Sequence, residues 1–151
     1  MRISAKADYA VRAAVELANA GDEPVKGERL AEAQDIPLQF LEHILLELKH
    51  ARLVRARRGA RGGYWLAKPA EEIRLADVIR AVEGPLANIQ DQAPEATKYP
   101  GNAELLSQVW IAVRASLRRV LENVTVADLR DGNLPPEVLE MTEDEGAWVT
   151  R

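Results

Sequence analysis

Residues 55–68, RARRGARGGYWLAK, place four arginines and three glycines between two short apolar runs. The stretch by itself is compatible with a disordered basic linker, a loop that cradles phosphate, or the tip of a β-hairpin that contacts an anion. The runs at 53–54 (LV) and 64–66 (YWL) favour β-strands, and two such runs joined by a Gly-rich turn are typical of a hairpin. Glycine at 59, 62 and 63 allows that turn to adopt positive φ angles and to approach a surface closely. We therefore predict a hairpin with a cationic tip.

A pair of amphipathic helices is predicted immediately before this hairpin. Residues 27–34 favour a short helix, a break follows at 35–36, and residues 37–50 favour a second helix with Pro37 at its first position. The second helix has one apolar stripe at helical spacing, formed by Leu41, Ile44, Leu45 and Leu48. Two helices joined by a turn of about three or four residues form a helix-turn-helix, and a hairpin directly after it is a wing.

The rest of the chain is predicted to be mainly helical. The spacing of apolar residues predicts further helices at 4–19, 74–83 and 103–124. Ser4 is the expected N-cap of the first of them. Residues 85–102 lack a sustained period and are predicted as a loop, and residues 132–151 as an acidic, weakly ordered tail. The predicted fold class is mainly α, an α+β winged helix-turn-helix with a small β-hairpin wing and a long C-terminal helix.

The charge of the chain is unevenly distributed. The net charge is −4, but residues 49–68 carry seven lysines or arginines and no acid, whereas residues 126–151 carry seven acids and two arginines. For a site that binds phosphate, the local field matters more than the sum of all charges. Because the basic block coincides with the predicted wing, the sequence indicates a nucleic-acid-binding surface there.

Several classes of protein are disfavoured by the composition. The sequence has no cysteine and only two histidines, His43 and His50, which excludes thiolate chemistry and disfavours a structural metal site. No nucleophile–base pair, carboxylate dyad or phosphate-binding loop is recognisable, and GARGGY does not precede a predicted helix. We therefore expect neither an enzyme nor a cofactor. The charged N-terminal residues and the lack of an apolar run near the roughly 18 residues of a membrane span lead us to expect a cytoplasmic protein.

Four motifs in this order resemble the Rrf-type family of bacterial winged-helix transcription regulators (IscR/NsrR/CymR-like). They are MRISAKADYAVRA, LAEAQDIPLQFLEHILLELKHARLV, RRGARGGYWLAKPAEEIRLADVIRAVEG and LENVTVADL, and the resemblance covers about residues 1–131. It implies a sequence-specific homodimeric regulator, a repressor, on a partly palindromic DNA operator. Many relatives hold an iron–sulphur cluster through three cysteines in the loop that corresponds to residues 85–102. Since that loop has no cysteine here, the resemblance is to a cluster-free branch of the family.

The resemblance and the chemistry of the side chains together suggest the DNA contacts. The second helix of the helix-turn-helix is expected in the major groove and the wing in the minor groove. Gln39 can pair with adenine, Glu42 can accept from a cytosine amino group, and His43 can donate to guanine or phosphate. Arg58 matches the wing arginine that enters the minor groove in relatives. The full set of expected DNA contacts is Ser4, Lys6, Tyr9, Gln39, Glu42, His43, Arg57, Arg58 and Arg61.

The long helix carries two apolar rows. The first row, the expected dimer interface, consists of Leu106, Trp110, Val113, Leu117, Val120 and Val124. A second row of Leu105, Val109, Ala112 and Leu121 widens this surface. A helix of this kind can bury one row in its own domain and the other against a second copy. The alternative is a single wide face in the core of one chain.

The predicted organisation has four parts. Residues 1–84 form the DNA-binding domain, 85–102 the loop, 103–131 the dimerisation helix with a short following helix, and 132–151 the acidic tail. A dimeric winged-helix adaptor that binds a protein and no longer reads DNA is the alternative function. The sequence also leaves open what controls the regulator, whether a small molecule held between Tyr99 and Trp110 or a co-regulator protein.

Overall fold

The computed structural model describes residues 2–150, so Met1 and Arg151, at the ends of the predicted first and last parts, lie outside the described residues. Its α-helices are α1 (Ala5–Ala20), α2 (Gly27–Gln34), α3 (Leu38–His50), α4 (Leu75–Glu83), α5 (Leu106–Leu121), α6 (Val126–Asp131) and α7 (Pro136–Thr142). The two strands are β1 (Val54–Arg57) and β2 (Gly63–Leu66), and four 3-10 turns are η1 (Ala70–Glu72), η2 (Pro94–Ala96), η3 (Gly101–Ala103) and η4 (Glu145–Trp148). The predicted mainly helical fold with one hairpin is confirmed.

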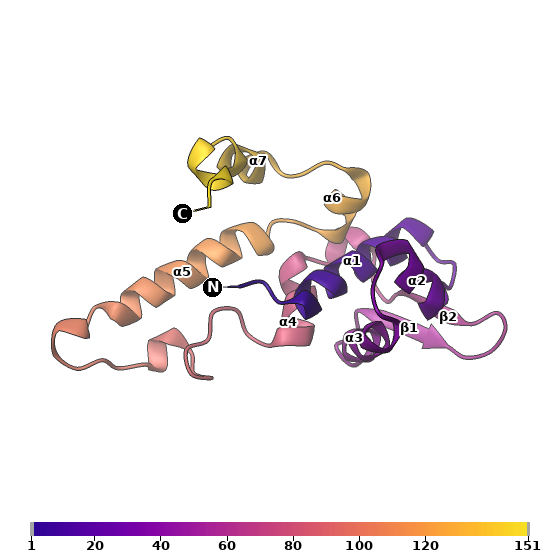
Figure 1. Cartoon of the computed structure of the whole chain (residues 1–151), viewed down its shortest axis with the longest axis horizontal. Coiled ribbons are helices and arrows are strands. Elements are labelled where there is room, and N and C mark those ends of the chain that lie inside the picture. The colour runs from indigo at the N-terminus through magenta and orange to yellow at the C-terminus, as the bar shows by residue number, and fades with distance from the viewer. Residues whose placement is uncertain (1, 151) are drawn as a thin grey trace.

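Helix α1 forms the centre of the folded domain (Figure 1). It begins where expected, because the Ser4 hydroxyl accepts a hydrogen bond from the Ala7 amide at 3.0 Å and so acts as the N-cap. Its buried face consists mostly of alanines around Leu17. Small side chains allow neighbouring helices to approach closely, and α1 accordingly packs against α2, α3, α4, α6 and β2. Helices α2, α3, α4 and α6 are thus held together through α1.

The helix-turn-helix consists of α2 and α3. Asp35 ends α2 in the left-handed conformation at φ 51°, which allows Ile36 to turn into the core. The predicted apolar stripe of α3 is confirmed, since Leu41, Ile44, Leu45 and Leu48 each have 0% of their surface exposed. Pro37 precedes the first helical residue and is not part of the helix, a one-residue difference from the prediction.

The wing consists of two antiparallel strands, and the sequence did not indicate that a third segment, at Val25, also pairs with it. Arg55 pairs with Trp65 and Ala56 with Tyr64 across β1 and β2. In addition, the Val25 amide donates to the Tyr64 carbonyl at 2.9 Å, and the Tyr64 amide donates to the Val25 carbonyl at 2.8 Å. This bridge fastens the wing to the segment that leads into α2.

Two of the wing glycines are required by packing within the protein. A Cβ atom at Gly63 would lie 2.7 Å from the Val25 carbonyl carbon and oxygen, and Gly63 has a φ of 145°. A Cβ atom at Gly62 would lie 2.0 Å from the Arg57 carbonyl oxygen. Only Gly59, with a φ of 104° and open space around its Cα, has the freedom at the tip that we expected of all three.

Helix α5 and the loop before it extend away from the rest of the fold as an arm (Figure 1). The helix is shorter than predicted, because 101–103 form a separate 3-10 turn and the chain leaves the helix after Leu121. The prediction for Val124 is wrong. It lies beyond the helix with 3% of its surface exposed, and its carbonyl accepts a hydrogen bond from the Leu75 amide at 2.9 Å. Val124 therefore belongs to the core of its own chain and cannot form a dimer interface.

The C-terminal region also differs from the expected weakly ordered tail. Residues 136–142 form α7, with Pro136 at the first helical position, where the missing amide hydrogen costs nothing. The 3-10 turn η4 follows, and the Trp148 indole nitrogen donates to the Thr142 carbonyl at 2.6 Å. The tail is solvated, as expected, but it contains regular structure.

Candidate nucleic-acid interface

Helix α3 presents a polar face to solvent, opposite its buried stripe. Gln39, Glu42 and His43, the three residues expected to contact bases, are all exposed on this face. Leu46 and Lys49 continue the same face, because residues three and four apart lie on one side of a helix. The structure thus brings the three predicted side chains together and adds Leu46, which was not among the predicted contacts although its spacing from Glu42 and His43 indicates the same face.

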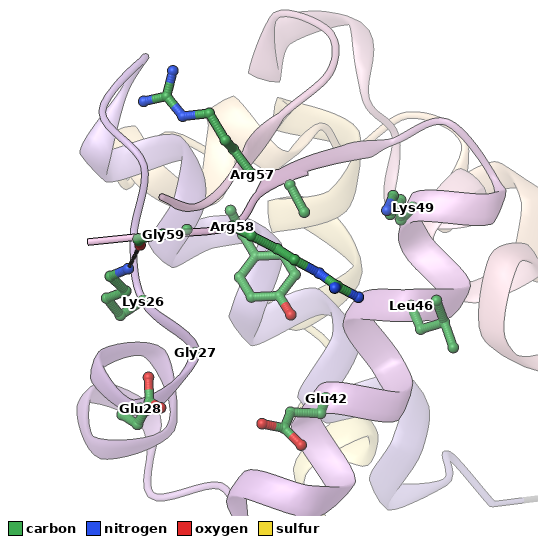
Figure 2. A pocket seen from close by; sticks show the side chains of 12 residues that line it. Lys26, Gly27, Glu28, Glu42, Leu46, Lys49, Arg57, Arg58 and Gly59 are labelled. Carbon is green, nitrogen blue, oxygen red and sulfur yellow. Dashed lines mark hydrogen bonds between the residues drawn. The ribbon is translucent and has the colours of Figure 1, made fainter. Parts of the chain in front are cut away.

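A groove of about 520 Å³ separates α2 and α3 from the wing. Arg58 reaches from the wing across this groove toward α3, whereas Arg57 points away from it (Figure 2). The charged side chains of the lining are Lys26, Glu28, Glu42, Lys49, Arg57 and Arg58. Four of these are cationic and two are acidic, so the local charge is positive in a chain whose net charge is −4. A groove of this sign attracts a polyanion.

The wing tip is held by two hydrogen bonds to backbone carbonyls. Arg57 Nη2 donates to the carbonyl of Arg61 at 3.0 Å, which keeps the two predicted phosphate-binding arginines together. Lys26 Nζ donates to the carbonyl of Gly59 in the turn (Figure 2). Lys26 is 33 residues away in sequence, and no local sequence pattern indicates this contact. The arginines are therefore carried on a turn that Arg57 braces internally and that Lys26 attaches to the segment before α2.

Ser4 and Lys6, the predicted contacts at the start of α1, already have partners within the protein. The Ser4 hydroxyl donates to the Glu83 carboxylate at the end of α4. Lys6 Nζ lies 2.9 Å from Glu47 Oε1 on α3. The other oxygen of Glu47, Oε2, is buried without a hydrogen-bond donor among the described residues. Lys6 is thus the counter-ion of Glu47. Any contact of Lys6 with a DNA phosphate competes with this ion pair.

Tyr9 joins α1 to the beginning of α3. Its ring packs edge-to-face against Phe40, with 5.7 Å between the ring centroids and 84° between the planes. The Arg12 guanidinium lies 5.1 Å from the centroid of the Tyr9 ring. An aromatic pair in this geometry stabilises the contact beyond its buried area. Tyr9 therefore orients α3, whether or not its hydroxyl reaches a phosphate.

The loop before α5 is attached to that helix by polar contacts. Trp110 Nε1 donates to the Tyr99 hydroxyl at 3.1 Å, so these two side chains contact each other and do not form opposite walls of an open cavity. Arg114 Nη1 lies 2.8 Å from Glu95 Oε2. The pKa of Glu95 lies below its usual value, because its carboxylate accepts hydrogen bonds from the Glu95 backbone amide and from Arg114. This side of α5 therefore faces the loop of its own chain.

The two apolar rows of α5 consequently have different surroundings. The residues of the first row within the helix are half-buried: Leu106, Trp110, Val113, Leu117 and Val120. In the second row, Leu105 is 67% exposed and Val109 is 51% exposed. The most exposed apolar side chains on this arm are thus in the second row, and Ile111, outside both rows, is 38% exposed.

The C-terminal end of α5 is linked to α4 by ion pairs. Arg80 of α4 donates to the Glu122 carboxylate, and this hydrogen bond lowers the pKa of Glu122. Arg118 Nε lies 3.8 Å from the same carboxylate. The arm is therefore fixed to α4 at its C-terminal end, and it projects freely at the other.

Comparisons with known proteins agree with this arrangement. The model of the Rrf2 family, described as iron-dependent transcriptional regulators, matches residues 3–132. A Mycobacterium tuberculosis protein provisionally named HTH-type transcriptional regulator Rv1287 is 50% identical over 145 residues, which cover 95% of this chain and 90% of the relative. CymR of Bacillus subtilis is 33% identical over 130 residues, covering 85% and 89% of the two chains.

Solved structures show the same relationship. The structure of CymR, the global cysteine regulator of B. subtilis, has a TM-score of 0.73 at 30% identity and covers 88% of this chain and 98% of its own. IscR of T. potens has a TM-score of 0.69 at 30% identity and covers 100% and 93%. Both similarities extend over the winged helix and the arm.

The described iron dependence of the family does not fit the residues of this chain. Iron–sulphur clusters are held mainly by cysteine thiolates, and the sequence has no cysteine. Within residues 2–150, no group of three or more His, Cys, Asp or Glu side chains is arranged to hold a metal ion.

Among residues 2–150, no helix is long and apolar enough to cross a bilayer. The fold, the groove and the comparisons agree, and the chain belongs to the Rrf2 family of DNA-binding transcriptional regulators, in a cysteine-free branch of it.

Proposed function

We propose that the protein is a cytoplasmic, homodimeric repressor that binds a partly palindromic operator without a cluster and without enzymatic activity. The observation that carries this proposal is the groove in which the exposed face of α3 and Arg58 of the wing lie on opposite sides. In a dimer, two copies of α3 enter successive major grooves and the wings reach the flanking minor grooves. The winged helix of residues 1–84 then binds DNA, and α5 joins the two copies.

Because the chain has no thiol, we propose that release from DNA is triggered by a small-molecule effector or a co-regulator protein. The Tyr99–Trp110 contact would have to open before a ligand could enter between those side chains. A co-regulator needs no such opening.

Selection from a pool of random DNA duplexes tests the proposal directly. We expect the purified protein to enrich an inverted repeat, with two protomers per duplex and a Kd that rises steeply between about 50 and 200 mM salt. The adaptor alternative predicts that no sequence is enriched above the starting pool. Transcription in vitro from a promoter that overlaps the enriched sequence then distinguishes repression from activation.

Replacement of Arg58 by alanine tests the role of the wing. Arginine suits the narrow, electronegative minor groove, so we expect its loss to weaken binding to the selected duplex by about 1–3 kcal/mol, or roughly fivefold to 150-fold in Kd. Gel-shift titration measures the effect. Lys98→Ala removes one exposed positive charge from the loop before α5, outside the groove, and is the control. Equal affinities of Arg58→Ala and Lys98→Ala for the duplex would show that Arg58 does not contact the DNA.

A further inference from the structure

Leu46 stands out among the apolar residues of α3. The four residues of the buried stripe are completely covered, whereas Leu46 is 47% exposed. Phe40 is also exposed at 40%, but its ring packs against Tyr9. Leu46 lies on the polar face, four residues after Glu42 and three before Lys49, and these three side chains line the groove together (Figure 2).

An exposed leucine by itself is common on protein surfaces. What distinguishes this one is its position in the middle of the face that α3 turns toward the DNA in the proposed function. Glu42 precedes it along that face, Lys49 follows it, and Arg58 approaches from the wing. A polar side chain at this position could donate or accept a hydrogen bond at a base edge, and leucine can do neither.

The major groove offers one apolar group to such a side chain. Donors and acceptors identify guanine, cytosine and adenine, whereas thymine also presents the C5 methyl group. Four residues of α-helix rise about 6 Å, so Leu46 and Glu42 are close enough to contact the same half-site. We propose, as an extension of the proposed function, that Leu46 recognises the methyl group of a thymine in the half-site that Glu42 contacts.

Uracil is the probe for this contact, because it pairs with adenine as thymine does and lacks only the methyl group. In the duplex selected by the wild-type protein, each thymine is replaced by uracil in turn, symmetrically in both half-sites. At one position we expect the wild-type Kd to rise about tenfold or more, since each buried methyl group that is removed raises the Kd about three- to fivefold and the two half-sites multiply. Leu46→Ala is expected to bind the thymine and uracil duplexes at this position with equal affinity.

Two further variants make the result specific. Leu139→Ala removes a side chain of nearly the same exposure, 46%, from α7, and it should retain the full preference for thymine. Leu46→Met retains an apolar side chain and should also retain this preference. Because Leu46 is exposed, we expect the melting temperature of Leu46→Ala to equal that of the wild type, so a change in Kd is not due to unfolding.

The outcomes separate this inference from the proposed function. If no duplex is enriched, the proposed function fails. If a duplex is enriched but the wild-type protein tolerates uracil at every position, the thymine contact is refuted while the function stands. The same holds if Leu46→Ala prefers thymine as strongly as the wild type does.

Discussion

Replacement of Gly63 by alanine is expected to detach the wing from the helix-turn-helix. The new Cβ atom would lie 2.7 Å from the carbonyl carbon and oxygen of Val25, so the Val25 backbone has to shift, and this shift disturbs its bridge to Tyr64. The φ of 145° adds strain for any residue other than glycine. We expect a loss of about 3 kcal/mol in the free energy of unfolding, or roughly 6–12 °C in melting temperature.

Gly59→Ala is the matched control for this change. Gly59 also has a positive φ, 104°, on the same hairpin, but nothing lies within 4 Å of a Cβ atom built there. Backbone strain alone is expected to cost about 1–2 kcal/mol. Thermal unfolding followed by circular dichroism compares the two variants. Equal losses of stability would mean that the approach of Gly63 to Val25 contributes nothing.

Val109→Asp is expected to separate the two copies of the proposed dimer. Val109 is 51% exposed on α5, so a charge at this position is solvated in the single chain and leaves its fold intact. In a dimer formed by this row, the same charge would be buried against apolar side chains. Loss of the second copy removes half of the operator contacts, and we expect the Kd for a full inverted repeat to rise by at least about a hundredfold.

Ile111→Asp tests whether the effect is confined to one side of α5. Two residues correspond to a rotation of about 200°, so Ile111 lies almost opposite Val109, and it is 38% exposed. Light scattering on both variants gives the mass in solution. Dimeric Val109→Asp together with monomeric Ile111→Asp would place the interface on the other side of α5.

The part of the fold predicted from the sequence depends on local pattern. Four core residues of α3 recur at the helical period, and Ser4 stands directly before the first helix, so both features could be identified within a window of a few residues. Burial of the stripe and capping by Ser4 are confirmed. The wing could be predicted because glycine and arginine are concentrated between two β-prone runs.

The rest depends on contacts between distant segments or on the capping motif that follows α5. No local pattern links Val25 to Tyr64 or Lys26 to Gly59, because a single pair of residues forms each contact. The apolar spacing of the preceding helix continues through Val124, so this spacing does not mark where the helix ends. The capping box in which Thr125 and Asp128 exchange hydrogen bonds marks the start of α6, and it shows that α5 has to end before it.

The residues of the candidate site also fall into two groups, those predicted from local pattern and those whose contacts join distant segments. Gln39, Glu42 and His43 share one exposed face because helical spacing determines it. That Ser4, Lys6 and Tyr9 have partners on α3 and α4 follows only from how α1 is packed. The sequence therefore indicates which residues face outward along a helix, but not which of them are already bound to another part of the protein.

The double attachment of the wing has a consequence for how an operator is chosen. Val25 and Lys26 hold the wing to the segment that leads into the helix-turn-helix at two points, so the distance between α3 and the backbone that carries Arg58 is set before DNA is bound. A rigid pair of probes requires the duplex to change its own groove width and curvature to meet both. That deformation is easier at pyrimidine–purine steps than in stiff A-tracts. In the proposed complex, base pairs that lie between α3 and Arg58 can thereby influence affinity through their flexibility without a direct contact.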